Sequence, residues 1–233
     1  INPHGGPFGI YDRWGFDPDI QMLASHGYAV MQVNFRGSGN YGKRFEEAGY
    51  KQWGKAMQDD LTDATQWAIS QGIADPDRIC IYGASYGAYA AMMGVAREQD
   101  LYACAIGYVA VYDLPLMVKV DTRGSLDRYS SGWWLKKFFL ETLGRENLDQ
   151  ISPVNLATSI KVPVMLGGGE LDETAPIKQT KMLKTALDKS GNPTEMKIYD
   201  NEGHGNFLIE NRLDWANRVL DFLDRNIGPK SGK

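Results

Sequence analysis

The feature that most constrains this chain is the segment Gly83-Ala84-Ser85-Tyr86-Gly87, which separates two runs of different character. The mostly apolar run at 78–82 is typical of a buried strand, and the alanine- and methionine-rich run at 88–93 is typical of a helix. A strand that turns sharply into a helix crowds the turn, so positions two before and two after the serine must be small. The segment predicts a nucleophile elbow with Ser85 at its apex; the alternative is an ordinary glycine-rich turn.

Strand-like and helix-like runs alternate along most of the chain, which predicts an α/β fold with a mostly parallel sheet flanked by helices. Besides the elbow helix, we expect helices at about 59–71, capped by Asp59 or Asp60, and at 176–189 and 207–226. We assign residues 1–228 to one domain and 229–233 to a polar tail. The expected strands cover residues 29–34, 79–82, 103–109, 162–166 and 195–199.

Composition excludes several classes of function. The formal net charge of −4, without any tract rich in lysine and arginine, argues against nucleic acid as a partner. No apolar stretch is long enough to span a membrane, and no cluster of ligating residues or phosphate-binding loop implies a metal or an organic cofactor. The two cysteines, Cys80 and Cys104, fall in strand-like runs and are expected as buried thiols, with a disulfide between neighbouring strands left open. They do not decide the cellular compartment.

A serine hydroxyl becomes a strong nucleophile only when a neighbouring base accepts its proton, and histidine is the usual base near neutral pH. The chain has three histidines. His26 is expected at the end of a helix, and His4 belongs to a glycine-rich loop. His204 lies in a glycine-flanked loop after the last expected strand, at the same sheet edge as Ser85. His204 is therefore the candidate base.

The base needs a carboxylate to fix its tautomer. Asp172 follows the expected strand at 162–166 in a glycine-rich loop, and the order serine, acid, histidine is that of elbow-bearing sheets. Glu170 and Glu173 are competing candidates, but they are expected to face solvent or to cap the next helix. Asp200, at a strand end close to His204, is the strongest alternative to Asp172.

Two further groups are expected at the site. The backbone N–H of Tyr86 and that of Gly6, in a loop with two adjacent glycines, are candidate donors to an oxyanion, although the glycines could serve only a tight turn. Tyr112, Trp133 and Trp134 are candidates for an apolar substrate pocket. The alternative for the aromatic patch that contains the two tryptophans is a helix facing the core.

Several motifs in one order resemble the catalytic domain of the prolyl oligopeptidase family of serine peptidases, over nearly the whole chain. The resemblance implies an α/β-hydrolase fold, with Ser85 as nucleophile, Asp172 as orienting acid and His204 as base. It also implies short peptides as substrates and an N-terminal β-propeller, which this chain does not contain. The motifs are His4-Gly5-Gly6-Pro7, Asn34-Phe35-Arg36-Gly37-Ser38, Tyr41-Gly42, Trp53-Gly54, Asp75-Pro76-Asp77-Arg78-Ile79, the elbow, Ser152-Pro153 and Glu202-Gly203-His204-Gly205.

The favoured interpretation is a serine peptidase that cleaves short peptides through an acyl-enzyme. A carboxylesterase with the same residues, or a non-catalytic interaction domain on a hydrolase scaffold, are the alternatives. The opening residues Ile1–Pro7 read as the end of a strand followed by a tight loop, so we expect preceding strands outside this chain. The sheet edge exposed without them predicts association into homo-oligomers.

Overall fold

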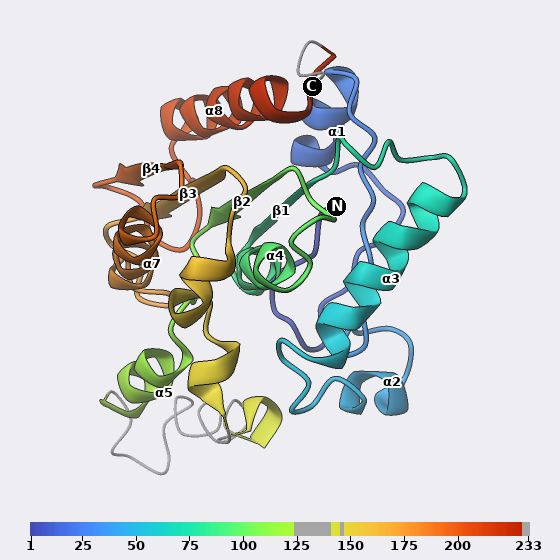
Figure 1. The fold of residues 1–233 in the computed structure, drawn as a ribbon. Helices are drawn as coiled ribbons and strands as arrows, with labels where there is room; N and C mark the ends of the chain where they lie inside the picture. Colours follow the sequence, from blue (N-terminus) through green and yellow to red (C-terminus); the bar gives the residue numbers. More distant parts are fainter. Residues whose placement is uncertain (124–140, 145–146, 230–233) are drawn as a thin grey trace.

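A parallel sheet organises the chain in the computed structural model, which describes residues 1–123, 141–144 and 147–229 (Figure 1). Within these residues four strands pair in the order β1-β2-β3-β4, and every neighbouring pair is parallel. Parallel strands place all their carboxyl ends at one edge, so the loops that follow them meet there. The strands are β1 (Cys80–Ala84), β2 (Cys104–Tyr108), β3 (Val164–Gly169) and β4 (Thr194–Tyr199).

Helices cover both faces of the sheet. In Figure 1, α8 and α1 lie on one side of the strands, and α4 and α7 lie on the other. The α-helices whose bounds the structure describes are α1 (Pro18–Ser25), α2 (Lys43–Glu47), α3 (Ala56–Ser70), α4 (Tyr86–Arg97), α5 (Leu114–Arg123), α7 (Lys178–Lys189) and α8 (Ile209–Ile227). Two 3₁₀-helices, η1 (Leu148–Ile151) and η2 (Pro153–Ser159), lead into β3.

Alternation along the strands divides the core into two layers, because successive side chains of a strand point to opposite faces. Ile81 and Ala105 pack with α4 and α7, in a cluster that includes Met92 and Leu183. Neighbouring strand residues face the other way and pack with α1 and α8, in a cluster that includes Leu23, Cys80, Ile106, Trp215 and Phe222. Both strand faces are therefore apolar, as a sheet covered on both sides requires.

Two predicted elements differ from the structure. The segment 29–34 is not a strand: its one ladder contact is the parallel bridge between Asn2 and Gln32, so the pairing is too short to form one. The helix predicted from about residue 59 begins at Ala56, and neither expected cap residue caps it. The Asp60 carboxylate instead binds the Arg36 side chain, with N–O distances of 2.6 and 2.8 Å. Asp60, which the local sequence predicted as a helix cap, therefore forms a tertiary ion pair with Arg36 instead.

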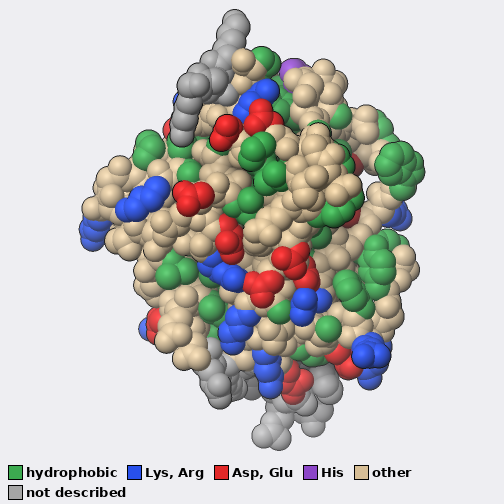
Figure 2. Space-filling model, turned by 45° about the vertical axis from the view of Figure 1, so that its right-hand side comes forward, with side chains coloured by type: hydrophobic (Ala, Val, Ile, Leu, Met, Phe, Trp, Pro, Cys, Tyr) green, Lys and Arg blue, Asp and Glu red, His purple; other side chains and the backbone are tan. Residues whose placement is uncertain are grey.

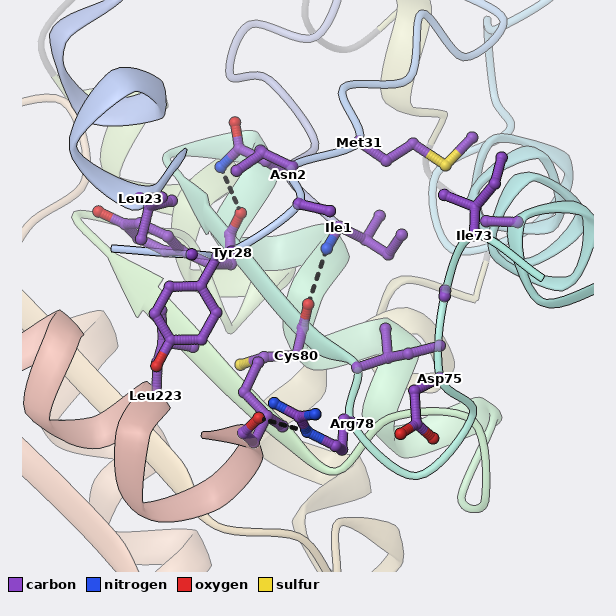
Figure 3. Close-up of a pocket in the computed structure, with 18 of the residues that line it drawn as sticks. Ile1, Asn2, Leu23, Tyr28, Met31, Ile73, Asp75, Arg78, Cys80 and Leu223 are labelled. Carbon is purple, nitrogen blue, oxygen red and sulfur yellow. Dashed lines mark hydrogen bonds between the residues drawn. The ribbon is translucent and has the colours of Figure 1, made fainter. Parts of the chain in front are cut away.

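A cavity of about 430 Å³ lies at the amino end of β1, between α1, α3 and α8, and is called here the amino-end cavity (Figure 3). The α-amino group of Ile1 donates to the Cys80 carbonyl at 2.8 Å, and the Asn2 side chain donates to the Tyr82 carbonyl at 2.7 Å. These two bonds place the first residues of the chain alongside β1. Apolar side chains, including Leu223, form much of the wall.

The surface carries both signs of charge. In Figure 2 acidic and basic side chains lie interspersed over the middle and lower part of the face, and hydrophobic side chains gather along its right-hand edge. In the described ranges, no helix has the length and apolar character that crossing a membrane requires. Cys80 and Cys104 lie opposite each other in the register of β1 and β2, and both are free, buried thiols.

Candidate active site

Ser85 occupies the turn between β1 and α4. Its φ of 55° lies in the left-handed region, which is uncommon for a residue other than glycine and marks a strained turn. A Cβ on Gly83 would collide with the backbone of Gly87, and a Cβ on Gly87 would collide with the carbonyl of Pro3. The two glycines are therefore required by close backbone approach, and they leave Ser85 half-buried at the carboxyl edge of the sheet.

His204 reaches Ser85 from the loop between β4 and α8. Its Nε2 atom lies 3.1 Å from the Ser85 hydroxyl oxygen, and its Nδ1 atom lies 2.8 Å from an Asp172 carboxylate oxygen. A carboxylate can only accept, so Nδ1 carries the proton and Nε2 is free to accept the serine proton. The three side chains form one hydrogen-bonded series, although they are far apart in the sequence.

The loop after β3 holds Asp172 rigidly. One carboxylate oxygen contacts His204, and the other accepts the backbone N–H groups of Thr174 at 2.9 Å and Ala175 at 2.7 Å. Only 1% of the Asp172 side chain is exposed, so its charge acts on the imidazole with little screening by water. Burial, backbone bonds and the imidazole contact thus fix both the position and the direction of this carboxylate.

The competing acids lie elsewhere. Asp200 is exposed at the end of β4, and Glu173 is exposed beside Asp172. Glu170 forms a surface ion pair with Lys181 at 2.9 Å. None of these three carboxylates makes a hydrogen bond to His204 in the part of the chain that the structure describes.

Glu202 has a place at the site that sequence reasoning missed. It is 1% exposed, and its carboxylate accepts the backbone N–H groups of Phe207 and Leu208, both at 2.9 Å, and the Asn211 amide at 2.8 Å. Burial by itself raises the pKa of Glu202, but the bonds from Phe207, Asn211 and Leu208 outweigh it, so the pKa is lowered. The Glu202 carboxylate thereby closes the loop that carries the imidazole onto the start of α8.

The backbone of Glu202 ties the same loop to that of the acid. Its carbonyl accepts the N–H of Leu171 at 2.9 Å, and it packs so closely on Gly169 that a Cβ there would collide with it. Its position two residues before the candidate histidine base is the only hint in the sequence, whereas its burial and its bonds to Phe207, Leu208 and Asn211 are visible only in the tertiary structure.

The glycine-rich loop passes directly beside the elbow. A Cβ on Gly5 would lie 3.4 Å from the Cβ of Ser85, and Gly6 has a φ of 118° that favours glycine. His4 holds this loop: its Nδ1 donates to the Gly5 carbonyl at 2.7 Å, and its Nε2 accepts from Ser38 at 2.8 Å. His4 is thus a buried structural residue, and the two glycines lie where close approach to a substrate is sterically feasible.

Of the three expected pocket residues, the structure describes only Tyr112. Tyr112 is fully buried, and a Cβ on Gly107 would collide with its hydroxyl, so among the described residues it belongs to the core below the sheet edge. This prediction was wrong because the residue packs with α4 and η2 instead of facing solvent. Trp133 and Trp134 lie outside the described residues. His26 is exposed at the end of α1, where Nδ1 donates to the Met22 carbonyl at 2.8 Å, as its helix-end interpretation expected.

A second cavity, of about 370 Å³, adjoins the serine and the imidazole and is called here the Ser85 cavity. It extends between α1 and α8, and its lining includes Ser85, Tyr108, His204, Asn206 and Arg212. The Tyr108 hydroxyl donates to the side-chain oxygen of Asn206, which fixes that amide in the wall. Among the described residues no group of three or more potential ligands is arranged to hold a metal ion.

The sheet, the elbow and the hydrogen-bonded serine, histidine and aspartate define an α/β-hydrolase. The sequence model of the prolyl oligopeptidase family matches residues 14–230, so the chain belongs to this family. Dipeptidyl aminopeptidase BIII of Pseudoxanthomonas mexicana is 32% identical, over 98% of this chain and 33% of its own length. Dipeptidyl peptidase family member 6 of Caenorhabditis elegans is 30% identical, over 97% of this chain and 30% of its own length.

Solved structures agree on the fold. A puromycin-hydrolyzing peptidase of Mycobacterium tuberculosis superposes with a TM-score of 0.88 at 25% identity, over 97% of this chain and 34% of that one. An acylaminoacyl peptidase, solved with a peptide chloromethyl ketone, gives a TM-score of 0.83 at 25% identity, over 97% of this chain and 36% of that one. The predicted α/β-hydrolase class is confirmed. The chain spans about a third of the length of these relatives.

Proposed function

We propose that this chain is the catalytic domain of a serine peptidase that hydrolyses short peptides through an acyl-enzyme intermediate. The observation that carries the proposal is the hydrogen-bonded series of Ser85, His204 and Asp172, with contacts of 3.1 and 2.8 Å. Membership of the prolyl oligopeptidase family supports it, and so do relatives named as a dipeptidyl aminopeptidase and an acylamino-acid-releasing enzyme.

The reaction follows from the protons that these groups can hold. His204 Nε2 takes the hydroxyl proton of Ser85 as the oxygen attacks the scissile carbonyl, and Asp172 stabilises the resulting imidazolium. Collapse of the tetrahedral intermediate breaks the C–N bond, and the imidazolium gives its proton to the departing amine. Water then attacks the acyl-serine with His204 as base, which releases the acid and restores the hydroxyl.

The negative charge that develops on the carbonyl oxygen needs donors that are already in position. We assign this role to the backbone N–H groups of Tyr86 and Gly6. Tyr86 is the first residue of α4, where the helix dipole adds a partial positive charge, and Gly6 follows the glycine that contacts Ser85. Each such donor is typically worth about 10²- to 10³-fold in rate.

A carboxylesterase is the main alternative, since the same three residues can cleave esters. Matched substrates distinguish the two: peptides and methyl esters with the same acyl group, compared by kcat/KM. A peptidase cleaves the peptide with measurable turnover, whereas an esterase acts on the ester alone. A non-catalytic domain would cleave neither.

The first test is covalent labelling with a fluorophosphonate, followed by peptide mass mapping of the full-length protein. We expect one phosphonyl group on Ser85, and turnover lowered on the order of 10⁶-fold in Ser85→Ala. Ser70→Ala, which removes an exposed serine at the end of α3, is the matched control and should keep the label. Labelling at a different residue, or activity retained by Ser85→Ala, would contradict the proposal.

A further inference from the structure

If the proposed function holds, the position of the Ser85 cavity relative to His204 shows which part of a peptide substrate it would hold. In that mechanism the imidazole gives its proton to the departing amine, so the leaving part of a peptide lies on the His204 side of the scissile bond. The cavity wall continues from His204 through Gly205 and Asn206 to α8. It therefore lies where the residues after the cleaved bond would be held.

One cation in this wall has no ion-pair partner in the described part of the chain. The other arginines of α8 are paired: Arg218 binds Asp214 at 2.7 Å, and Arg225 binds Glu195 at 2.7 Å. Arg212 lines the Ser85 cavity, is exposed, and forms none of the ion pairs found among the described residues. An arginine fork of this kind matches a carboxylate geometrically.

Asp19 is the one acid among the residues that line the Ser85 cavity, and it contributes the opposite charge from α1. Partial desolvation raises the pKa of Asp19, the neighbouring Asp17 raises it further, and Arg212 lowers it, so the field of Arg212 extends across the cavity. No ion pair joins Asp19 to Arg212 among the described contacts. The guanidinium therefore keeps its hydrogen-bond donors available to a ligand.

We propose that the Ser85 cavity receives the leaving-group residues of the peptide, and that Arg212 binds the terminal carboxylate of these residues. Asn206 assists, because the Tyr108 hydroxyl occupies its oxygen while no described residue accepts from its amide nitrogen. A volume of about 370 Å³ is at the lower end of the range for small-ligand sites, which suits a short leaving segment. The preferred substrates are thus peptides that end close after the scissile bond with a free carboxylate.

The test compares paired peptides that differ only at the C-terminus, as the free acid or as the amide. Both should end two residues after the scissile bond, and an anilide with the same acyl group should accompany them. In the full-length protein we expect the acid to exceed the amide in kcat/KM by about tenfold, typical of one partly exposed charge-assisted contact. In Arg212→Gln the ratio of acid to amide should fall to about one, mainly through KM for the acid.

Two variants on the same face sharpen the result. Arg218→Gln is the matched control, because it removes a paired arginine of α8 outside the cavity lining, and it should keep the acid preference. Asp19→Asn removes a negative charge from the cavity and should increase the preference. Equal rates for acid and amide, or an equal fall for both in Arg212→Gln, would overturn the inference alone. Failure to cleave the anilide as well as both peptides would contradict the peptidase function, and with it this inference.

Discussion

The two ends of β1 each adjoin a cavity, and the two cavities have similar volumes but walls of different chemistry. The amino-end cavity, of about 430 Å³, is walled mainly by apolar side chains and by the first residues of the chain (Figure 3). The Ser85 cavity, of about 370 Å³, contains the hydroxyl, the imidazole, an amide and two opposite charges. The amino-end cavity is the larger, yet it contains none of the three residues of the hydrogen-bonded series.

The difference follows from strand direction. In a parallel sheet each carboxyl end continues into a loop, so Ser85, Asp172 and His204 arrive at one edge from three separate strands. Their side chains can converge there without disturbing the core. The amino ends receive chain returning from helices, and the buried apolar faces of α1 and α8 meet there instead. Cavity size alone therefore does not identify the functional end of this sheet. The convergence of polar side chains from separate strands does.

The largest effect should follow from changing the carboxylate at the carboxyl edge. Asp172→Asn leaves the side chain's shape but can donate to Nδ1, which favours the wrong imidazole tautomer. We expect kcat to fall by about 10⁴-fold, with the midpoint of thermal unfolding changed little. Steady-state kinetics on a peptide substrate and a thermal melt measure both.

Asp200→Asn is the matched control for that change, because it alters an exposed acid near the same loop. Turnover close to that of the unmodified protein is expected for this control. A large loss in Asp200→Asn, together with normal turnover in Asp172→Asn, would transfer the orienting role to the exposed acid.

The amino-end cavity should respond in stability and not in catalysis. Leu223→Ala deletes a side chain that is 4% exposed, and it should lower the free energy of unfolding by about 2–3 kcal/mol while kcat stays the same. Ile73→Ala in the same wall is 60% exposed and should cost at most about 0.5 kcal/mol. Urea titration measures the free energy of unfolding of both variants. A kcat that falls with Leu223→Ala would remove the distinction between the two ends.

Glu202 offers a smaller effect at the carboxyl edge. In Glu202→Gln an amide replaces one acceptor oxygen and points a donor at a backbone N–H, so the loop that carries His204 should shift. We expect kcat/KM to fall by about 10- to 100-fold, as a misplacement of about 1 Å would cause. Exposed Glu210→Gln on the first turn of α8 is the control and should have no such effect. If Glu202→Gln lowers only stability, the residue has no positioning role.

The smallest expected effect is a pH dependence of the stability that Glu202 contributes. The pKa of Glu202 is lowered in the folded state from its ordinary 4.5, so its contribution is complete above about pH 4.5. That contribution is lost as the pH falls through the lower, folded value. The stability advantage of the unmodified protein over Glu202→Gln should therefore be larger at about pH 7 than at about pH 3. Urea midpoints of both proteins at the two pH values measure it, and an advantage that grows on acidification would contradict the assignment.

Local patterns could predict much of this fold because the residues concerned act on their immediate neighbours. Gly83 and Gly87 crowd the turn on either side of Ser85, and the apolar runs of β1 and β2 match a sheet buried on both faces. The three residues of the hydrogen-bonded series were also predictable, since parallel strands and chain order leave few combinations. The alternation of strand-like and helix-like runs thus predicted a parallel sheet flanked by helices.

Properties that depend on distant partners could not be predicted in this way. The Asp60 carboxylate binds Arg36 instead of capping α3, and Tyr112 packs into the core instead of lining the site. The predicted strand at 29–34 makes only one bridge among the described residues, to Asn2, so it does not form a strand.

The sequence by itself determined the elbow, the parallel sheet, and the serine and histidine that converge at the site, because backbone crowding and hydrophobic periodicity are local. Only the tertiary structure decided which of several acids faces the imidazole, that Glu202 closes the histidine loop, and that Arg212 lines the Ser85 cavity without an ion pair among the described residues. Those outcomes depend on burial and on distances between residues far apart in the chain, and neither quantity is encoded in any short window of sequence.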